Sequence, residues 1–279
     1  MTRLNYKTAA TIQIVLTAVA VTALSRNASA QEADPAAPPA APAEEAPASR
    51  YPRSVIDRPL TLPKGLAMLG ADLTANHDFS LIGAAPIIGY GFSDDFEAQL
   101  SYGFALEDFE AKGSLALDLG YKILRGALGG KFEMIGRVRG GYNALLEVAN
   151  PIQVGLHMQY NATPKLAIIS GVPGTEHLKI TIDDGGTGVS PIDFSLPLGI
   201  GYQATKELYF QVDTKLFQID IQDSANVLIG DDATPVSLTA VYNATPALDI
   251  QALIGTDLSN EPDNTLNFLV GFRYYAGQL

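Results

Sequence analysis

The sequence YNATP occurs twice, at Tyr160–Pro164 and at Tyr242–Pro246, and a looser copy, YQATK, occupies Tyr202–Lys206. Each copy lies between segments in which apolar residues alternate with polar residues or glycine. The first copy ends the segment IQVGLHMQY at 152–160, and the second precedes LDIQALIGTD at 248–257. A period of two is the pattern of a β-strand with one apolar face. Each copy is therefore predicted to be the tight turn of a β-hairpin.

The alternating pattern continues through most of the chain and predicts twelve strands. Short turns fall on one side of the predicted structure and longer loops on the other. Strands of about ten residues are long enough to cross a bilayer at a tilt. We expect the strands near residues 66–75, 82–91, 96–106, 113–123, 131–142, 152–160, 165–172, 193–203, 207–217, 234–243, 247–257 and 265–276.

One face of these strands carries no ionised residue in the strand centres. A charge on the lipid side of a membrane barrel costs about 2–4 kcal/mol at the bilayer midplane, so an uncharged face is expected there. Because lipid does not tolerate an open sheet edge, the strands must close. The predicted fold class is all-β, a closed antiparallel transmembrane β-barrel of about 12 strands.

Tyrosines mark one end of six strands on the same apolar face. A tyrosine ring suits the membrane interface because its body is apolar and its hydroxyl can reach the headgroups. We therefore expect an aromatic girdle on the side of the short turns, which we place in the periplasm. Its members are Tyr90, Tyr121, Tyr160, Tyr202, Tyr242 and Tyr274.

The first 62 residues differ in composition from the predicted barrel. Residues 1–30 combine the basic Arg3 and Lys7, an apolar run and an Ala28-Ser29-Ala30 ending, and so predict a signal peptide cleaved after Ala30. Residues 31–62 are predicted to be an Ala/Pro-rich periplasmic linker and lead-in, because the stretch 31–50 has no large apolar residue to bury. The barrel is assigned to residues 63–279.

The strand pattern over about residues 63–276 resembles the bacterial outer-membrane β-barrel, porin-like superfamily. The resemblance implies a Gram-negative outer membrane, contact with its lipid and lipopolysaccharide, and insertion by the barrel-assembly machinery. Barrels of this kind commonly end on an aromatic residue. Here FRYY at 272–275 is followed by AGQL.

Charge and composition exclude several other functions. The chain has 18 Lys and Arg against 30 Asp and Glu, and this acidic balance disfavours a nucleic-acid partner. The absence of cysteine excludes disulfides and a lipoprotein anchor. No catalytic residue, metal centre or cofactor is predicted. His157 faces inward without a serine on its own strand, and the nearby Ser170 has the opposite parity.

The polar face of the strands is predicted to line the lumen. Basic residues gather on the fourth to seventh strands, whereas Asp72, Glu97 and Asp249 are expected opposite them, so that a transverse field would act on solutes. This arrangement favours a passive pore or channel for small solutes. The predicted lumen-lining residues are Asp72, Glu97, Lys122, Glu133, Arg137, Arg139, His157, Lys165, Asp213, Asp249 and Arg273.

A second interpretation stays open. If the interior charges pair and fill the barrel, no pore remains, and the protein would act as a structural or surface-interaction protein through its acidic extracellular loops. The stretches DDGGTG at 183–188 and NEPDN at 260–264 lack the spacing of a known calcium loop. They are interpreted as solvated acidic loops, with weak divalent-cation binding as the alternative.

The uncharged strand face and the tyrosines predict that the mature protein fractionates with the outer membrane and needs detergent for extraction. A folded barrel should also migrate differently on a denaturing gel before and after boiling. Recovery of the protein in the soluble periplasmic fraction would contradict the membrane assignment.

Overall fold

The computed structural model describes residues 51–277, apart from 107–112, 145–146, 172–176, 181–191, 221–225, 229–234 and 259–264. The predicted signal peptide, the stretch 31–50 and both acidic loop motifs lie outside the described residues.

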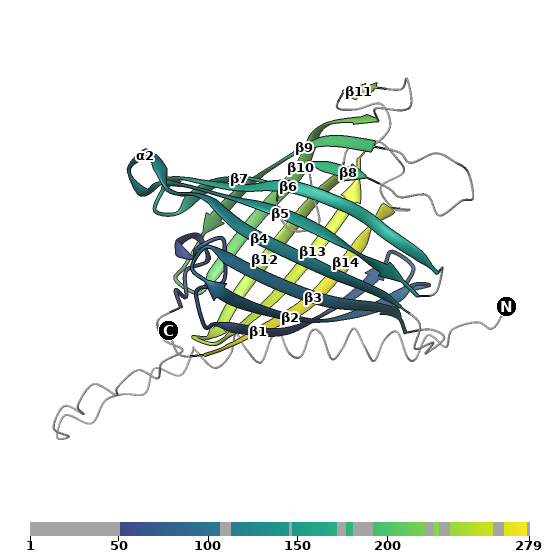
Figure 1. The fold of residues 1–279 in the computed structure, drawn as a ribbon, viewed down its shortest axis with the longest axis horizontal. Helices are drawn as coiled ribbons and strands as arrows, with labels where there is room; N and C mark the ends of the chain where they lie inside the picture. The colour runs from purple at the N-terminus through teal and green to yellow at the C-terminus, as the bar shows by residue number, and fades with distance from the viewer. Residues whose placement is uncertain are drawn as a thin grey trace. The chain divides into compact units, whose positions relative to one another are not determined.

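Within the described part of the chain, twelve strand positions form one closed antiparallel barrel (Figure 1). The closing pair is β1 with β14, which are in register from Ala67 opposite Ala276 to Asn76 opposite Asn267. The strands are β1 (Ala67–Asn76), β2 (Ile82–Ser93), β3 (Phe96–Ala105), β4 (Ser114–Gly126), β5 (Phe132–Asn143), β6 (Val148–Thr163), β7 (Leu166–Ser170), β8 (Leu178–Ile180), β9 (Ile192–Gln203), β10 (Leu208–Asp220), β12 (Pro235–Thr245), β13 (Leu248–Asp257) and β14 (Asn267–Ala276).

The predicted fold class is confirmed, and two short strands are additional. β7 and β8 both pair with β6 on one side and β9 on the other, so together they fill a single strand position that is interrupted after Ser170. β11 (Asn226–Leu228) pairs with the end of β10 and extends a hairpin beyond the barrel wall. The alternating pattern missed β8 and β11 because each of these two strands has only three residues.

The two faces of the wall differ as the alternation requires. Large apolar side chains on the outer face stay exposed, including Leu69 at 51%, Ile88 at 52% and Ile200 at 55%. A face of this kind is stable only against an apolar surrounding such as lipid. The interior parity carries the polar residues, many of them buried, such as Glu97 and Asp249.

The two ends of the barrel also differ. Short turns lie at one end, together with α2 (Ala127–Gly130), and the described connection between β1 and β2 lies at the other (Figure 1). All six predicted girdle tyrosines lie near the short-turn end of their strands, and Tyr121 is the most exposed of them at 60%. Their contact with a membrane interface stays a prediction. Among the described residues, no helix is long and apolar enough to cross a membrane.

Residues Tyr51–Leu66, which we call the insert, pack inside the barrel at its short-turn end, where Figure 1 draws them in purple. Residues 31–62 were predicted to be linker and lead-in, and the structure departs from that prediction from Tyr51 onward. The reason is composition: unlike the stretch 31–50, the insert carries large apolar residues. Ile56 and Leu66 are 2% and 0% exposed, and the 3-10 helix η2 (Val55–Asp57) is the one regular element of the insert.

The orientation of the barrel can be tested in this cysteine-free chain with two exposed positions at opposite ends. Leu128 in α2 is 72% exposed, and Asp78 lies in the exposed connection between β1 and β2. With the short turns in the periplasm, a thiol reagent too large for a pore should label Asp78→Cys on intact cells. It should label Leu128→Cys only after the cells are permeabilised. The opposite result would show that the barrel is inverted.

Candidate functional site: the interior of the barrel

Three neighbouring strands join their interior charges into one cluster. The guanidinium of Arg137 on β5 lies 2.9 Å from Glu97 Oε1 on β3 and 2.9 Å from Asp118 Oδ1 on β4. The side chains of Arg137 and Glu97 are only 7% and 2% exposed. Glu97 and Arg137 are not on adjacent strands, because both pair with Gly120 of β4. A Cβ atom at Gly120 would lie 3.0 Å from the Glu97 side chain, so glycine leaves the space in which the ion pair forms.

Other interior charges pair in the same way. Lys122 Nζ lies 3.2 Å from Glu133 Oε1 on the adjacent strand. Arg273 on β14 donates two hydrogen bonds, of 2.7 and 2.8 Å, to Asp72 on β1. The predicted separation of acids and bases across the lumen is therefore wrong for these residues. Register, which the sequence does not show, places each of these acids beside a base in the wall.

Three other predicted lumen residues have different surroundings. Asp213 on β10 accepts hydrogen bonds of 2.8 and 3.0 Å from Gln211. His157 lies on the interior parity opposite Ile135, and its Nδ1 has no hydrogen-bond partner among the described residues. Lys165 was predicted to line the lumen but lies exposed in the turn between β6 and β7. In the alternating pattern Lys165 falls on the inward-facing side, but β6 ends at Thr163 and β7 begins only at Leu166, so Lys165 is not part of the barrel wall.

Asp249 on β13 is occupied by the insert. Arg58 of the insert forms a bidentate ion pair with this carboxylate, with Nη2 3.0 Å from Oδ1 and Nη1 paired with Oδ2. The two side chains are 8% and 4% exposed. The guanidinium also lies 4.9 Å from the ring centroid of Tyr51 and 5.5 Å from that of Tyr275, within range of cation–π attraction.

Burial and charge set the ionisation of these groups. Burial is the largest single effect on Arg58 and would lower its pKa, but the hydrogen bond to Asp249 and the charge interactions with Tyr51, Asp249 and Tyr275 together outweigh burial and raise the pKa above the ordinary value. Burial raises the pKa of Tyr51, and the Arg58 charge opposes this only in part. Arg58 is therefore a cation and Tyr51 a neutral phenol throughout the physiological pH range.

Two further carboxylates each bond to the wall through one oxygen and to the insert through the other. Glu97 pairs with Arg137 through Oε1 and accepts the backbone N–H of Leu62 through Oε2 at 2.7 Å. Glu133 pairs with Lys122 through Oε1 and accepts the N–H of Leu60 through Oε2 at 3.0 Å. Both acids were predicted to face the lumen. The strand pattern gave no indication that the backbone N–H groups of residues 60 and 62 would donate hydrogen bonds to them.

Strands β6 and β9 bind the insert at Ile56. Its N–H donates to Gln203 Oε1 at 3.2 Å, and its carbonyl accepts from Gln159 and Asn161 at 2.9 and 3.2 Å. The Ile56 side chain packs in a buried cluster with Ala167, Ile169 and Tyr209. Nearer the start of the insert, Arg53 Nε donates to Asn243 Oδ1 at 2.8 Å.

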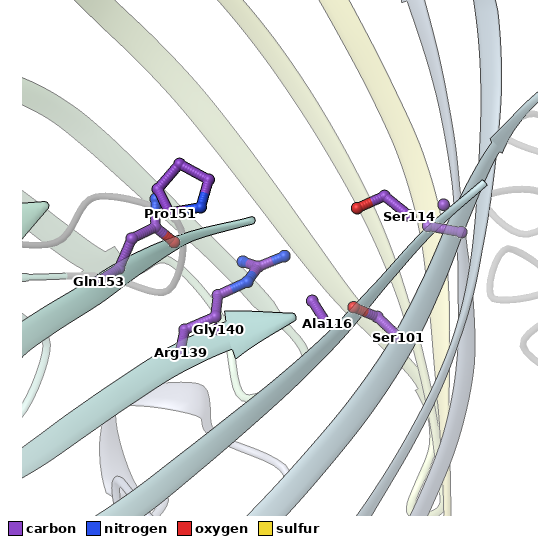
Figure 2. Close-up of a pocket in the computed structure, with 9 residues that line it drawn as sticks. Ser101, Ser114, Ala116, Arg139, Gly140, Pro151 and Gln153 are labelled. Carbon is purple, nitrogen blue, oxygen red and sulfur yellow. The ribbon is translucent and has the colours of Figure 1, made fainter. Parts of the chain in front are cut away.

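The other half of the lumen contains a cavity of about 330 Å³. Arg139 lines it together with Gln153, Ser101 and Ser114, and Figure 2 shows the guanidinium extending between Pro151 and Ser114. No acidic partner of Arg139 is found among the described residues, in contrast to Arg137 two positions earlier. The lining of this cavity combines polar side chains with small apolar ones, and Arg139 adds a cationic group to it.

Comparison with known proteins adds the fold relationship. No protein-family model and no curated protein sequence matches the chain. Among solved structures, the KdgM porin superposes with a TM-score of 0.52 at 10% sequence identity, covering 74% of this chain and 98% of that chain. A structure of that porin in complex with disordered oligogalacturonate gives the same values. The NanC porin also gives 0.52 at 10% identity, covering 76% of this chain and 100% of that chain.

The chain shares its closed, porin-like β-barrel fold with the KdgM and NanC porins. Because the identity to both porins is only 10%, the likeness extends to the fold and not to individual residues. The functional residues of this porin-like barrel must therefore be argued from its own interior.

A serine and a histidine do meet in this porin-like barrel, where β7 is interrupted. Ser170 Oγ lies 3.2 Å from His177 Nε2, although the sequence analysis did not connect the two residues. The N–H of Leu156 donates to His177 Nδ1 at 3.2 Å, so the ring proton is on Nε2 and faces the serine. Ser170 in turn donates to the Pro197 carbonyl at 2.6 Å. With its proton on Nε2, His177 cannot accept the proton of the Ser170 hydroxyl and so cannot activate this serine as a nucleophile. The two side chains instead complete the hydrogen bonding where β7 is interrupted.

Metal ligation has no candidate in the described part of the barrel either. Within the described residues, no group of three or more His, Asp or Glu side chains is placed to hold a metal ion. The predicted weak cation binding by the loops at 183–188 and 260–264 concerns residues outside the described ranges, and it stays a prediction.

Arg137 and Arg139 offer a matched test of the interior ion pairs. Arg137→Gln leaves Glu97 and Asp118 without their cation, and breaking a buried pair in this way costs about 3–5 kcal/mol. Arg139→Gln removes no described ion pair, so its effect on stability should be under about 1 kcal/mol. Urea unfolding in micelles, followed by circular dichroism or by the gel shift because the chain has no tryptophan, measures both. Equal stabilities of the two variants would contradict this account of the cluster.

Proposed function

We propose that the protein is a passive outer-membrane channel for small polar solutes. The cavity of about 330 Å³ in the outer half of the lumen, lined in part by Arg139, Gln153 and Ser101, is the observation that carries this proposal. The interior of an eight-stranded barrel is just wide enough for its own side chains, and a barrel of twelve strands is wider. The likeness of the fold to the KdgM and NanC porins supports the same function.

The location follows from the same features. We infer that the chain is exported by cleavage of its signal peptide after Ala30 and inserted by the barrel-assembly machinery. Its exposed apolar face then contacts outer-membrane lipid and lipopolysaccharide. The exposed side chains of Leu69, Ile88 and Ile200 support this placement, because water would not accommodate a continuous apolar face of that kind.

For solute preference, we propose that Arg139 favours small anions. Its charge lies beside the cavity without a described acidic partner, whereas Arg137, Lys122 and Arg273 are each neutralised by a neighbouring carboxylate. A unit charge 4 Å from a passing ion contributes about 1 kcal/mol in water, and this effect weakens with distance and salt. One unpaired arginine is therefore enough to set a modest preference.

The alternative function is a filled barrel that acts as a structural or surface-interaction protein through its acidic loops. The ion pairs of the wall and the insert at the short-turn end favour this alternative. Single-channel recording of the refolded full-length protein distinguishes the two. Open steps support the channel. Silence in both the wild type and a variant lacking the Arg58–Asp249 ion pair supports the filled barrel.

Arg139→Gln should shift the reversal potential toward cations, with a loss of anion preference of up to about fivefold, the factor given by about 1 kcal/mol. Lys165→Gln is the matched control, because it removes the same charge from the exposed turn between β6 and β7. Its reversal potential should stay near that of the wild type at molar salt. An unchanged reversal potential in Arg139→Gln would show that this residue does not line the conducting path.

A further inference from the structure

The insert spans the short-turn end of the lumen. Its side chains and backbone contact interior residues of strands on all sides: Asn243 and Asp249 on β12 and β13, Gln203 on β9, Gln159 on β6, Glu133 on β5 and Glu97 on β3. Tyr51, Leu62 and Leu66 also form a buried apolar cluster with Met68 of β1 and Tyr275 of β14. Chain that contacts opposite walls of a barrel in this way occupies the path between them.

The barrel wall is complete without the insert. Each of the twelve strand positions pairs with its neighbours, and the closing pair β1–β14 uses no residue of the insert. Most hydrogen bonds between the insert and the wall involve a side chain on at least one partner, as for Ile56, Leu60 and Leu62, whose backbone groups bond to wall side chains. The insert's backbone bonds to the wall backbone lie at the junction with β1, where Gly65 N–H donates to the Gly91 carbonyl at 2.8 Å and Gly91 N–H donates to the Leu66 carbonyl at 3.0 Å.

That junction has the properties of a hinge. Gly65 has a φ of +82°, a conformation that glycine adopts without strain, and it directly precedes β1. Gly91 permits the close approach of the insert, because a Cβ atom there would lie 2.1 Å from the Pro63 carbonyl oxygen. A segment anchored at one end and otherwise held by side chains can leave without breaking the sheet.

If the insert left the lumen, the interior carboxylates would lose different numbers and kinds of partners. Glu97 and Glu133 would each lose a backbone N–H but keep Arg137 and Lys122 as cationic partners in the wall. Asp249 would lose its ion pair with Arg58 and keep hydrogen bonds from two neutral wall groups, Asn243 Nδ2 at 2.8 Å and the Tyr275 hydroxyl. The Arg58–Asp249 pair is therefore the contact most specific to the closed arrangement.

We propose that the insert is a releasable plug that closes the periplasmic mouth of the barrel, with Gly65 as its hinge and the Arg58–Asp249 ion pair as its latch. Solute passes when the plug has moved away. This proposal rests on the channel function proposed above, and the experiment below separates the failure of one from the failure of the other.

The first measurement is single-channel recording of the full-length protein. Arg58→Gln should raise the open probability at least about tenfold, which corresponds to about 1.4 kcal/mol. Asp249→Asn should have a similar effect, and the double variant should add little because both changes remove one interaction. Arg125→Gln is the control, since it breaks the exposed ion pair with Asp95 at the same end of the barrel without touching the insert.

The second measurement follows the insert itself by thiol labelling, whether or not current flows. Thr61 is 1% exposed, so the thiol of Thr61→Cys should react slowly in the parent and at least about tenfold faster when Arg58→Gln is added. Lys64→Cys is exposed and should react at the same rate in both backgrounds. Only protein that shows the heat-dependent gel shift of a folded barrel is compared, so that misfolding is not counted as release.

The outcomes are distinct. Higher open probability together with faster labelling supports the plug. Unchanged slow labelling in Arg58→Gln, or a wild type that conducts as fully as Arg58→Gln, overturns it, because the insert is then a fixed part of the barrel or lies outside the path. Faster labelling with no conductance in any variant overturns the channel function while leaving a releasable insert.

Discussion

Backbone hydrogen bonding is the constraint on which the rest of this structure depends. A strand in lipid has no water to satisfy its N–H and C=O groups, so each strand needs a partner on both sides and the sheet must close. Here closure is made by the pairing of β1 with β14 over ten residues, from Ala67–Ala276 to Asn76–Asn267. Once the wall is closed, strand alternation sends every second side chain inward, and the interior receives the polar residues that lipid would reject.

The interior then has to satisfy the polar groups that are buried in the wall, such as Glu97 and Arg137. The wall does this with an ion pair and a hydrogen bond that each pass over a glycine. Gly120 leaves space for Glu97 to meet Arg137, and Gly271 leaves space for Gln251 to donate to Asp72 at 3.1 Å. A larger residue at either position would separate the partners. Interior glycines of this kind are therefore part of the charge arrangement as well as of the backbone.

Much of the fold was predictable because it depends on local periodicity. The alternating pattern located all twelve strand positions, and the tyrosines identified the short-turn end. The pairing of charges was not predictable, because whether Arg137 meets Glu97 depends on the register of two strands against β4. Lys165 was misplaced because parity carries no information about where a strand ends. The insert was missed because residues 31–62 were treated as one segment, although large apolar residues begin at Tyr51.

The two halves of the lumen are therefore controlled by different physical features. In the half of the lumen away from the insert, Arg139 presents a charge that no described residue neutralises, so any effect of this charge on solutes would not depend on the insert. At the short-turn end, the charge of Asp249 is neutralised by Arg58 only while the insert is in place. Withdrawal of the insert would widen the path and, in the same step, expose a carboxylate. The open mouth would then be more acidic than the closed one, so the insert would control both the size and the charge of the exit, whereas the wall ion pairs would stay unchanged.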